Sequence, residues 1–186
     1  SKVGGGPIHM FRLGKLISKN FNVFYAIPKS KNFSKYLSDF NHINISERKL
    51  KLKDLIKIYR FSKENNIDLI HAHGKGAALI ARIIKIFNRR HLIFTFHGIH
   101  LKCHSKIVRI LYIIYENIFG LIDSYKVFVS YSEKLYARSS NIKIGKNSLI
   151  INNGVPNKSL LIPGNFSFTS RLHIKQYITI NKVPLL

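Results

Sequence analysis

Histidine and glycine recur together at the ends of two apolar runs in this sequence. The segments IDLIHAHG (67–74) and HLIFTFHG (91–98) each pass from apolar residues into His-Gly. An imidazole can donate or accept a hydrogen bond, and glycine lets a ligand approach the backbone closely. The two endings therefore predict one polar pocket, provided that both runs are neighbouring strands. The residues concerned are His71, His73, Gly74, His97 and Gly98.

Small or polar residues also follow three other expected strands. The segment SKVGGG (1–6) looks like the end of a strand entering a glycine turn. Bare backbone N–H groups at the following helix start could hold a phosphate or sugar oxygen, although a plain turn explains the same glycines. Ser132 is expected to cap a later helix, with Glu133 favouring its positive N-terminal end. The three endings are Gly4, Gly5 and Gly6; Ser130, Ser132 and Glu133; and Asn152, Asn153 and Gly154.

Neither a metal site nor a phosphate loop is predicted at these positions. The histidines between residues 71 and 104 have no Asp or Glu near them, and their spacing matches no zinc pattern. The segment GKGAA (74–78) lacks the Gly-Lys-Ser/Thr ending of a phosphate loop. Lys75 is therefore expected to be a solvated charge in the first turn of a helix.

Apolar periodicity predicts strands that alternate with helices along the whole chain, which favours parallel strands in an open α/β sheet. Ligands of such sheets bind beyond the carboxyl ends of the strands, so the glycine and histidine endings are expected to share one rim. The expected strands are 21–27, 42–46, 67–72, 91–96, 124–130 and 147–155, the last with its exit turn. The expected helices are 7–20, 34–40, 49–66 (opened by Ser46), 74–88, 105–122 and 132–140.

Charge and composition bound the partners of the chain. It has 31 Lys and Arg against 8 Asp and Glu, a formal charge of +23, which favours an anionic partner. A biased base composition of the genome explains the same excess. The single Cys103 makes no internal disulfide and fits a reducing, cytoplasmic compartment. No apolar run approaches the roughly 20 residues that span a bilayer, and the longest, 107–122, is expected to be a buried helix. Because the first residue is Ser1, the true start is expected to lie upstream.

Five segments together resemble the N-terminal half of a bacterial retaining glycosyltransferase of family four. They are GGGPIHMFRLGKLI, IDLIHAHGKGAALIAR, IFTFHGIH, VFVSYSEK and LIINNGV, in matching order and spacing over residues 3 to about 155. The resemblance implies the N-terminal half of a GT-B fold, a Rossmann-like open parallel sheet with helices on both faces. In that family this half mainly holds the acceptor, and the second domain holds most of the nucleotide-sugar donor. Many members build lipopolysaccharide, O-antigen or capsule at the cytoplasmic membrane face.

The resemblance also implies roles for individual residues. His97 matches the Thr-x-His position that reaches the transferred sugar and is the predicted catalytic residue. Gly5 and Gly6 would lie against the donor diphosphate or the acceptor. The implied mechanism is front-side attack through an oxocarbenium-like state, with no metal and no cofactor besides the nucleotide-sugar substrate. The other positions implied to bind donor or acceptor are His9, His73, Gly74, Gly98, Ser130, Asn153, Gly154 and Arg171.

The end of the chain departs from the family pattern. The segment FSFTSRLHIKQ (166–176) resembles the start of the second domain, with Arg171 as a diphosphate ligand, but Gln176 stands where a Lys is expected. The Glu-x7-Glu signature and a full first strand before Gly4 are missing. We therefore expect residues 1–162 to form the Rossmann-like domain and residues 163–186 a truncated start of the donor domain or a disordered tail. As such a fragment, the chain is expected to be inactive alone.

Two further interpretations come from the basic residues. The helix over 48–63 could hold the protein to an anionic membrane surface, or it could be an ordinary surface helix with its apolar stripe on the sheet. The alternative function is a basic nucleic-acid-binding α/β module, which the charge alone supports. Lysines spread along the whole chain and the absence of a nucleic-acid-binding motif make nucleic acid an unexpected partner.

Overall fold

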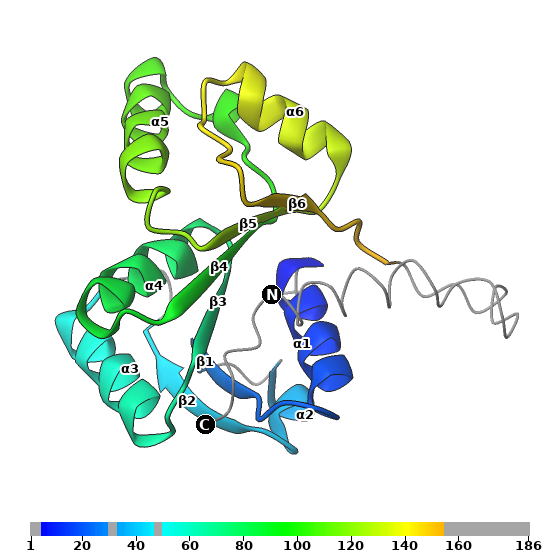
Figure 1. Cartoon of the computed structure of the whole chain (residues 1–186), viewed down its shortest axis with the longest axis vertical. Helices are drawn as coiled ribbons and strands as arrows, with labels where there is room; N and C mark the ends of the chain where they lie inside the picture. The colour runs from blue at the N-terminus through cyan, green and yellow to red at the C-terminus, as the bar shows by residue number, and fades with distance from the viewer. Residues whose placement is uncertain (1–4, 30–32, 47–49, 155–186) are drawn as a thin grey trace, which may run out of the picture.

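The computed structural model of the 186-residue chain describes residues 5–29, 33–46 and 50–154. Helices and strands alternate through these residues, as the periodicity predicts (Figure 1). In chain order the elements are α1 (Gly5–Ile17), β1 (Phe24–Pro28), α2 (Ser34–Leu37), β2 (Asn41–Ile45), α3 (Leu52–Glu64), β3 (Leu69–His73), α4 (Lys75–Asn88), β4 (His91–Phe96), the 3-10 turn η2 (Leu101–Cys103), α5 (Lys106–Phe119), β5 (Tyr125–Phe128), α6 (Tyr131–Ser139) and β6 (Ser148–Ile150).

Every strand pairing in the described residues is parallel, which confirms the α/β, Rossmann-like class. The strands divide into two hydrogen-bonded sheets rather than the single sheet expected. One has the order β1-β2 and the other the order β3-β4-β5-β6. Helices α3 and α4 lie on one side of the strands and α1 and α2 on the other (Figure 1).

Strand β4 is the centre of the four-stranded sheet, between β3 and β5. Its residues from Leu92 to Phe96 are all buried, as the continuous apolar run HLIFTF predicts for a strand covered on both faces. Phe96 stacks on Phe128 of β5 with ring centroids 4.8 Å apart. A second core around β1 contains Phe11, Tyr25, Ile27 and Leu37. The two cores hold the carboxyl ends of β3 and β4 rigidly side by side.

Several boundaries differ from those expected. Helix α1 begins at Gly5, so Gly5 and Gly6 lie in its first turn rather than in a preceding turn. Strand β3 continues to His73, because the backbone turns only at Gly74, whose φ is +86°. Helix α6 begins at Tyr131 and is capped by the residue before it, not by Ser132. The predictions for residues 1–4, 30–32, 47–49 and 155–186, including the domain boundary at 162, lie outside the described residues.

The expectation that the helix over 105–122 is buried is wrong. In α5 the one fully buried residue is Glu116, while large apolar side chains such as Ile107 and Leu111 are exposed. An ion pair explains why Glu116 is the buried residue of the helix. Arg82 of α4 is 0% exposed, and a buried guanidinium requires carboxylate partners. Its position between α4, α5 and the start of β5 fixes which side of α5 faces inward.

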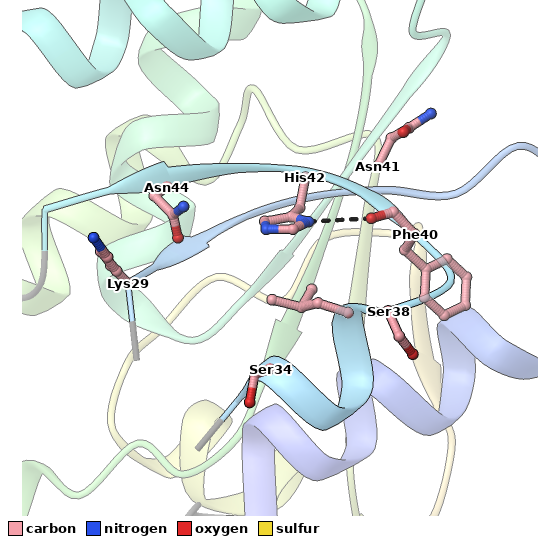
Figure 2. Close-up of a pocket in the computed structure, with 8 residues that line it drawn as sticks. Lys29, Ser34, Ser38, Phe40, Asn41, His42 and Asn44 are labelled. Carbon is pink, nitrogen blue, oxygen red and sulfur yellow. Dashed lines mark hydrogen bonds between the residues drawn. The ribbon is translucent and has the colours of Figure 1, made fainter. Parts of the chain in front are cut away.

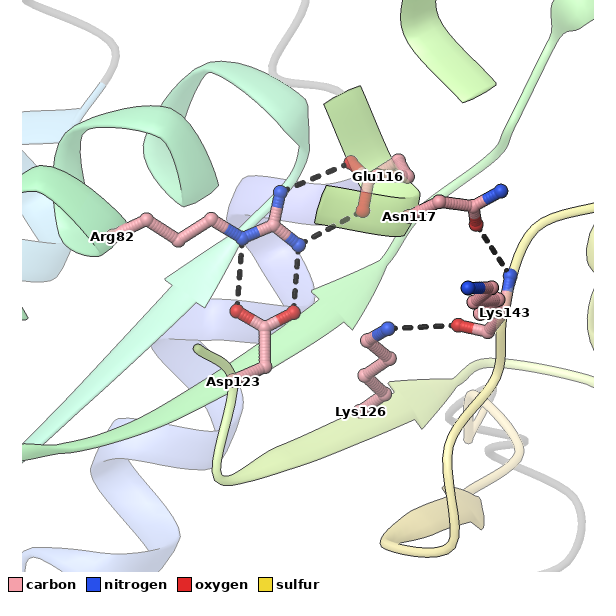
Figure 3. A network of polar contacts seen from close by, with 6 residues as sticks. All are labelled: Arg82, Glu116, Asn117, Asp123, Lys126 and Lys143. Atoms are coloured by element: carbon pink, nitrogen blue, oxygen red, sulfur yellow. Dashed lines mark hydrogen bonds and ion pairs between the residues drawn. The ribbon is translucent and has the colours of Figure 1, made fainter. Parts of the chain in front are cut away.

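Figure 3 shows how Arg82 holds these elements together. Its Nη2 lies 2.8 Å from Glu116 Oε2 and 2.6 Å from Asp123 Oδ2, and its Nε lies 2.9 Å from Asp123 Oδ1. Burial by itself lowers the pKa of Arg82, but its bonds to Asp123 and Glu116 outweigh burial and raise the pKa above its usual value. Arg82 therefore remains charged inside the domain, paired with Glu116 and Asp123.

Candidate functional site

The glycine-rich start of α1 and the end of β4 meet at one rim of the fold. A methyl group built on Gly6 would lie 3.5 Å from Cγ of His97, in ordinary van der Waals contact. The same methyl group on Gly5 would meet no atom within 4 Å. Gly5 therefore lines open space beside His97, where a ligand could approach the backbone.

Four histidines cluster at this rim. The ring of His9 on α1 lies 5.2 Å from that of His97 and 5.8 Å from that of His73, measured between ring centroids. The rings of His73 and His97 are stacked at 5.3 Å, and those of His71 and His73 lie 4.1 Å apart. We call His9, His71, His73 and His97 the histidine cluster.

Strand alternation brings two of these rings together. His71 and His73 are two residues apart in β3 and point to the same face, while Ala72 between them is buried on the other face. Helix α1, which carries His9, packs against the face of β3 that holds His71 and His73. Nε2 of His71 lies 2.7 Å from Oγ1 of Thr95 on β4, which ties the inner end of the histidine cluster to the central strand.

A hydrogen bond joins the two outer rings of the cluster. Nδ1 of His73 lies 3.0 Å from Nε2 of His97. One of these nitrogens must donate and the other accept, so the bond couples the tautomers of the two rings. The tautomer of His73 thus decides whether His97 presents a donor or an acceptor to a ligand.

The histidine cluster is neutral at pH 7. Burial, with a smaller contribution from His9, lowers the pKa of His71 to about 3 and that of His97 to about 4. Burial and the neighbouring imidazoles also hold the pKa of His73 well below its usual value. Burial lowers the pKa of His9 as well, although a hydrogen bond with Asn153 opposes that effect. The rings can therefore exchange hydrogen bonds with hydroxyl groups but cannot supply positive charge to a phosphate.

The two glycines that follow β3 and β4 have structural roles. Gly74 and Gly98 have positive φ values of 86° and 116°, which side chains disfavour. The N–H of Gly74 donates to the carbonyl of Thr95, 3.1 Å away, and is not free for a ligand. The expectation that Lys75 is solvated is wrong, because its Nζ donates to the carbonyl of Ile99 at 2.8 Å and lies 4.5 Å from the Tyr112 ring centroid.

The remaining predicted site residues divide into two groups. Asn153 reaches the rim, since its side chain hydrogen-bonds His9. The hydroxyl of Ser130 instead accepts from the backbone N–H of Glu133 at 3.1 Å and caps α6. Gly154 is exposed, and Arg171 lies outside the described residues. The structure thus brings together Gly5, Gly6, His9, His73, His97 and Asn153.

One member of the site, Thr95, is not among the residues predicted from the sequence. His71 is among them, and the two are hydrogen-bonded inside the rim. The alternation of His71, Ala72 and His73 puts both histidines on one face, because residues two apart in a strand share a face. Within the described residues, no group of His, Cys, Asp and Glu side chains is arranged to hold a metal ion.

A separate open hollow of about 920 Å³ lies between β2 and α2. Figure 2 shows Asn44 and His42 of β2 and Lys29 after β1 on one side, with Ser34 and Ser38 at the two ends of α2 on the other. Its amide and hydroxyl groups suit hydrogen bonds to polar ligands. It contains none of the predicted site residues, so we assign the site to the histidine cluster and not to this hollow.

A family model for Glycosyltransferase Family 4 matches residues 3–158, most of the chain. The chain belongs to Glycosyltransferase Family 4. The match includes the start of α1, the histidine cluster and the exit of β6. The family resemblance seen in the five sequence segments is thereby confirmed. No protein with a curated description matches the sequence.

Solved structures of GT-B glycosyltransferases share this fold. HepE from Anabaena in complex with UDP-glucose superposes with a TM-score of 0.65 and 16% identity, covering 97% of this chain and 48% of HepE. A complex of HepE with UDP and glucose gives 0.65 and 15% identity. A glycosyltransferase from Rickettsia africae ESF-5 gives 0.63 and 18% identity, covering 98% of this chain and 48% of its own. The Family 4 chain thus spans about half the length of these structures.

None of the helices in the described part of the chain is long and apolar enough to cross a bilayer.

Proposed function

We propose that this chain forms the acceptor-side half of a glycosyltransferase that moves a sugar from a nucleotide-diphosphate donor to a glycan or lipid-linked acceptor. The observation that carries the proposal is the contact of Gly6, His9, His73 and His97 at one rim of a Family 4 fold. Surface polysaccharide, such as lipopolysaccharide, O-antigen or capsule, is the proposed product class, and the cytoplasmic side of the membrane the proposed location. The resemblance to enzymes of that class supports both.

In this proposal His97 contacts the transferred sugar through a hydrogen bond. A neutral imidazole suits a sugar hydroxyl, and the bond from His73 presets which nitrogen of His97 carries the proton. The proposed transfer is retaining, with front-side attack through an oxocarbenium-like state. The charge on the leaving diphosphate must then be stabilised by groups outside the histidine cluster, for which Arg171 is our candidate.

The proposal includes no resident metal or cofactor, because the nucleotide sugar is a substrate. It also assigns most donor contacts to a second domain. Neighbours of about twice the length were crystallised with UDP and UDP-glucose, which supports a nucleotide-sugar donor. We therefore expect no transferase activity from the 186 residues alone. Sugar transfer by the purified chain would contradict this part of the proposal.

Imidazole resonances give a direct test that does not require turnover. Two-dimensional NMR of the imidazole C–H groups should show shifts at His97 and His73 when UDP-glucose or candidate acceptor glycans are added. His42 and His91 lie on β2 and at the start of β4, away from the rim, and serve as internal controls. If no nucleotide sugar or glycan moves the His97 resonance, or if His42 moves equally, the rim is not the sugar site.

The net charge of +23 favours a second candidate, binding to nucleic acid. The assay that separates the two is a salt titration on generic DNA. Binding through phosphate contacts loses affinity linearly with the logarithm of salt, whereas sugar binding through neutral imidazoles does not. A steep salt slope together with unmoved His97 resonances would favour the nucleic-acid function.

A further inference from the structure

Helix α5 exposes large apolar side chains although its inner face already packs against the core. On the inner face, Tyr112 and Ile113 pack against the core, and Glu116 is 0% exposed and bound to Arg82. On the outer face, Ile107 is 71% and Leu111 59% exposed. The core contacts and the ion pair explain the inner face, but they do not explain why the outer face is apolar. We call the following residues the α5 apolar face: Ile107, Ile110, Leu111, Ile114, Ile118 and Leu121.

The α5 apolar face is continuous. At about 100° per residue, the five members within α5 fall within an arc of about 100° on one side of the helix, and Leu121 follows the end of the helix at Phe119. With a rise of about 1.5 Å per residue, these five cover roughly 17 Å along the axis. Soluble monomers rarely expose so long an apolar strip, and where one occurs it marks an interaction site. The strip is too short to span a bilayer but long enough to lie on one.

Cations surround the α5 apolar face at both ends. Lys102, Lys106 and Arg109 are exposed at its N-terminal end. Lys143, also exposed, lies beside its C-terminal half, because its backbone N–H donates to Oδ1 of Asn117 at 2.7 Å (Figure 3). Residues 97–122 contain no acidic residue except the buried Glu116. An apolar strip with cations along one edge, and with no exposed acidic residue between 97 and 122, matches a surface that offers both anionic headgroups and acyl chains.

Two other occupants fit less well. A second copy of the chain would carry the same charge of +23 and bring like cations together at the contact. A continuation of the chain would begin from Gly154, where the described part ends. That exit lies on the side of α1, whereas α5 lies across the strands from it (Figure 1).

We propose that the α5 apolar face binds the surface of an anionic lipid bilayer, with α5 lying flat at the level of the headgroups. The contact places Lys106 and Lys143, which lie at one edge of the strip, against lipid phosphates, whereas Arg109 lies on the opposite side of α5. It differs from the membrane contact expected from sequence, which used the basic helix over 48–63. Membrane binding through this face does not require transferase activity, so it can be tested independently of the proposed function.

The test is co-sedimentation with vesicles of phosphatidylglycerol and phosphatidylcholine, compared with vesicles of phosphatidylcholine alone. The double variant Leu111→Gln/Ile114→Gln should weaken binding to the anionic vesicles by roughly tenfold or more, since it removes two inserted side chains. Leu52→Gln/Ile56→Gln on α3 is the matched control, because it removes two equally exposed apolar residues from a basic helix. This control should bind as the unchanged chain does. Circular dichroism checks that both variants are folded.

A second measurement uses the chain without substitutions, labelled at Cys103. Cys103 is the single cysteine and is exposed just before α5, so an environment-sensitive fluorophore on it reports insertion. Its emission should shift to the blue with anionic vesicles only. The proposal is overturned if the emission of the label does not shift, or if the α3 variant loses vesicle binding while the α5 variant keeps it. It is also overturned if the chain binds equally to vesicles without anionic lipid. It is also overturned if sedimentation velocity shows a dimer that Leu111→Gln/Ile114→Gln dissociates.

Discussion

Replacing Arg82 tests whether the buried ion pair decides how α5 packs. The variant Arg82→Met keeps most of the side-chain volume but leaves Glu116 and Asp123, whose side chains are both 0% exposed, without a cation. Removing one partner of such a buried group costs about 3–5 kcal/mol. That is a large share of the roughly 5–15 kcal/mol by which a domain is stable.

Urea unfolding, followed by circular dichroism, measures this loss. With a urea dependence of about 1–3 kcal/mol per molar, the midpoint should fall by about 2 M. Arg90→Met is the matched control, because Arg90 pairs with Asp68 at 3.5 Å in a partly exposed position. An exposed pair of this kind contributes only about 0–1 kcal/mol, so the control midpoint should hardly move.

A third variant isolates the reason for the loss. Arg82→Met combined with Glu116→Leu and Asp123→Leu buries no charge and should recover most of the stability, since apolar side chains replace buried ion pairs at little net cost. The reasoning is refuted if Arg82→Met loses no more than Arg90→Met, or if the triple variant is as unstable as the single one. Either result would mean that another contact holds α5 in place.

Two further predictions concern stability. Because the folded pKa values of His71 (about 3) and His97 (about 4) lie below the unfolded value of about 6.5, the unfolded chain binds more protons between these limits. The contribution of these histidines to the free energy of unfolding should therefore be fully present above about pH 6.5. Below that pH the free energy of unfolding should fall by up to about 1.4 kcal/mol per pH unit for each histidine. Equal urea midpoints at about pH 7 and pH 5 would contradict this. A methyl group at Gly14 would overlap the hydroxyl of Tyr25, whose ring is fixed between Phe11 and Phe40, so Gly14→Ala should destabilise the domain by about 1–3 kcal/mol. Adding Tyr25→Phe should recover part of the lost thermal midpoint, because it removes the hydroxyl but leaves the ring carbon Cζ close to the new methyl group. If Gly14→Ala and the double variant have equal midpoints, the overlap with the hydroxyl is not the cause.

Local sequence patterns were enough to predict the α/β architecture and the meeting of the glycine and histidine segments at one rim. The run HLIFTF is apolar on both faces and became the buried central strand β4. The alternation of strands and helices predicted parallel pairing, and parallel pairing places the ends of β3 and β4 side by side. The meeting of Gly6 and His97 follows from that geometry, because both lie where the chain leaves or enters the same rim.

Contacts between residues far apart in the chain decided what the patterns could not. The run 107–122 is apolar on nearly all sides, so its periodicity could not tell which side of α5 faces the core. The side that carries Glu116 faces inward because buried Arg82 needs carboxylate partners. Arg82 precedes Glu116 by 34 residues and Asp123 by 41 residues. The neutral state of the histidine cluster has the same origin, since it depends on burial of His73 and His97 against α1. Composition and periodicity report what a segment prefers on average, whereas charge state and facing depend on which distant side chains the fold brings within hydrogen-bonding distance.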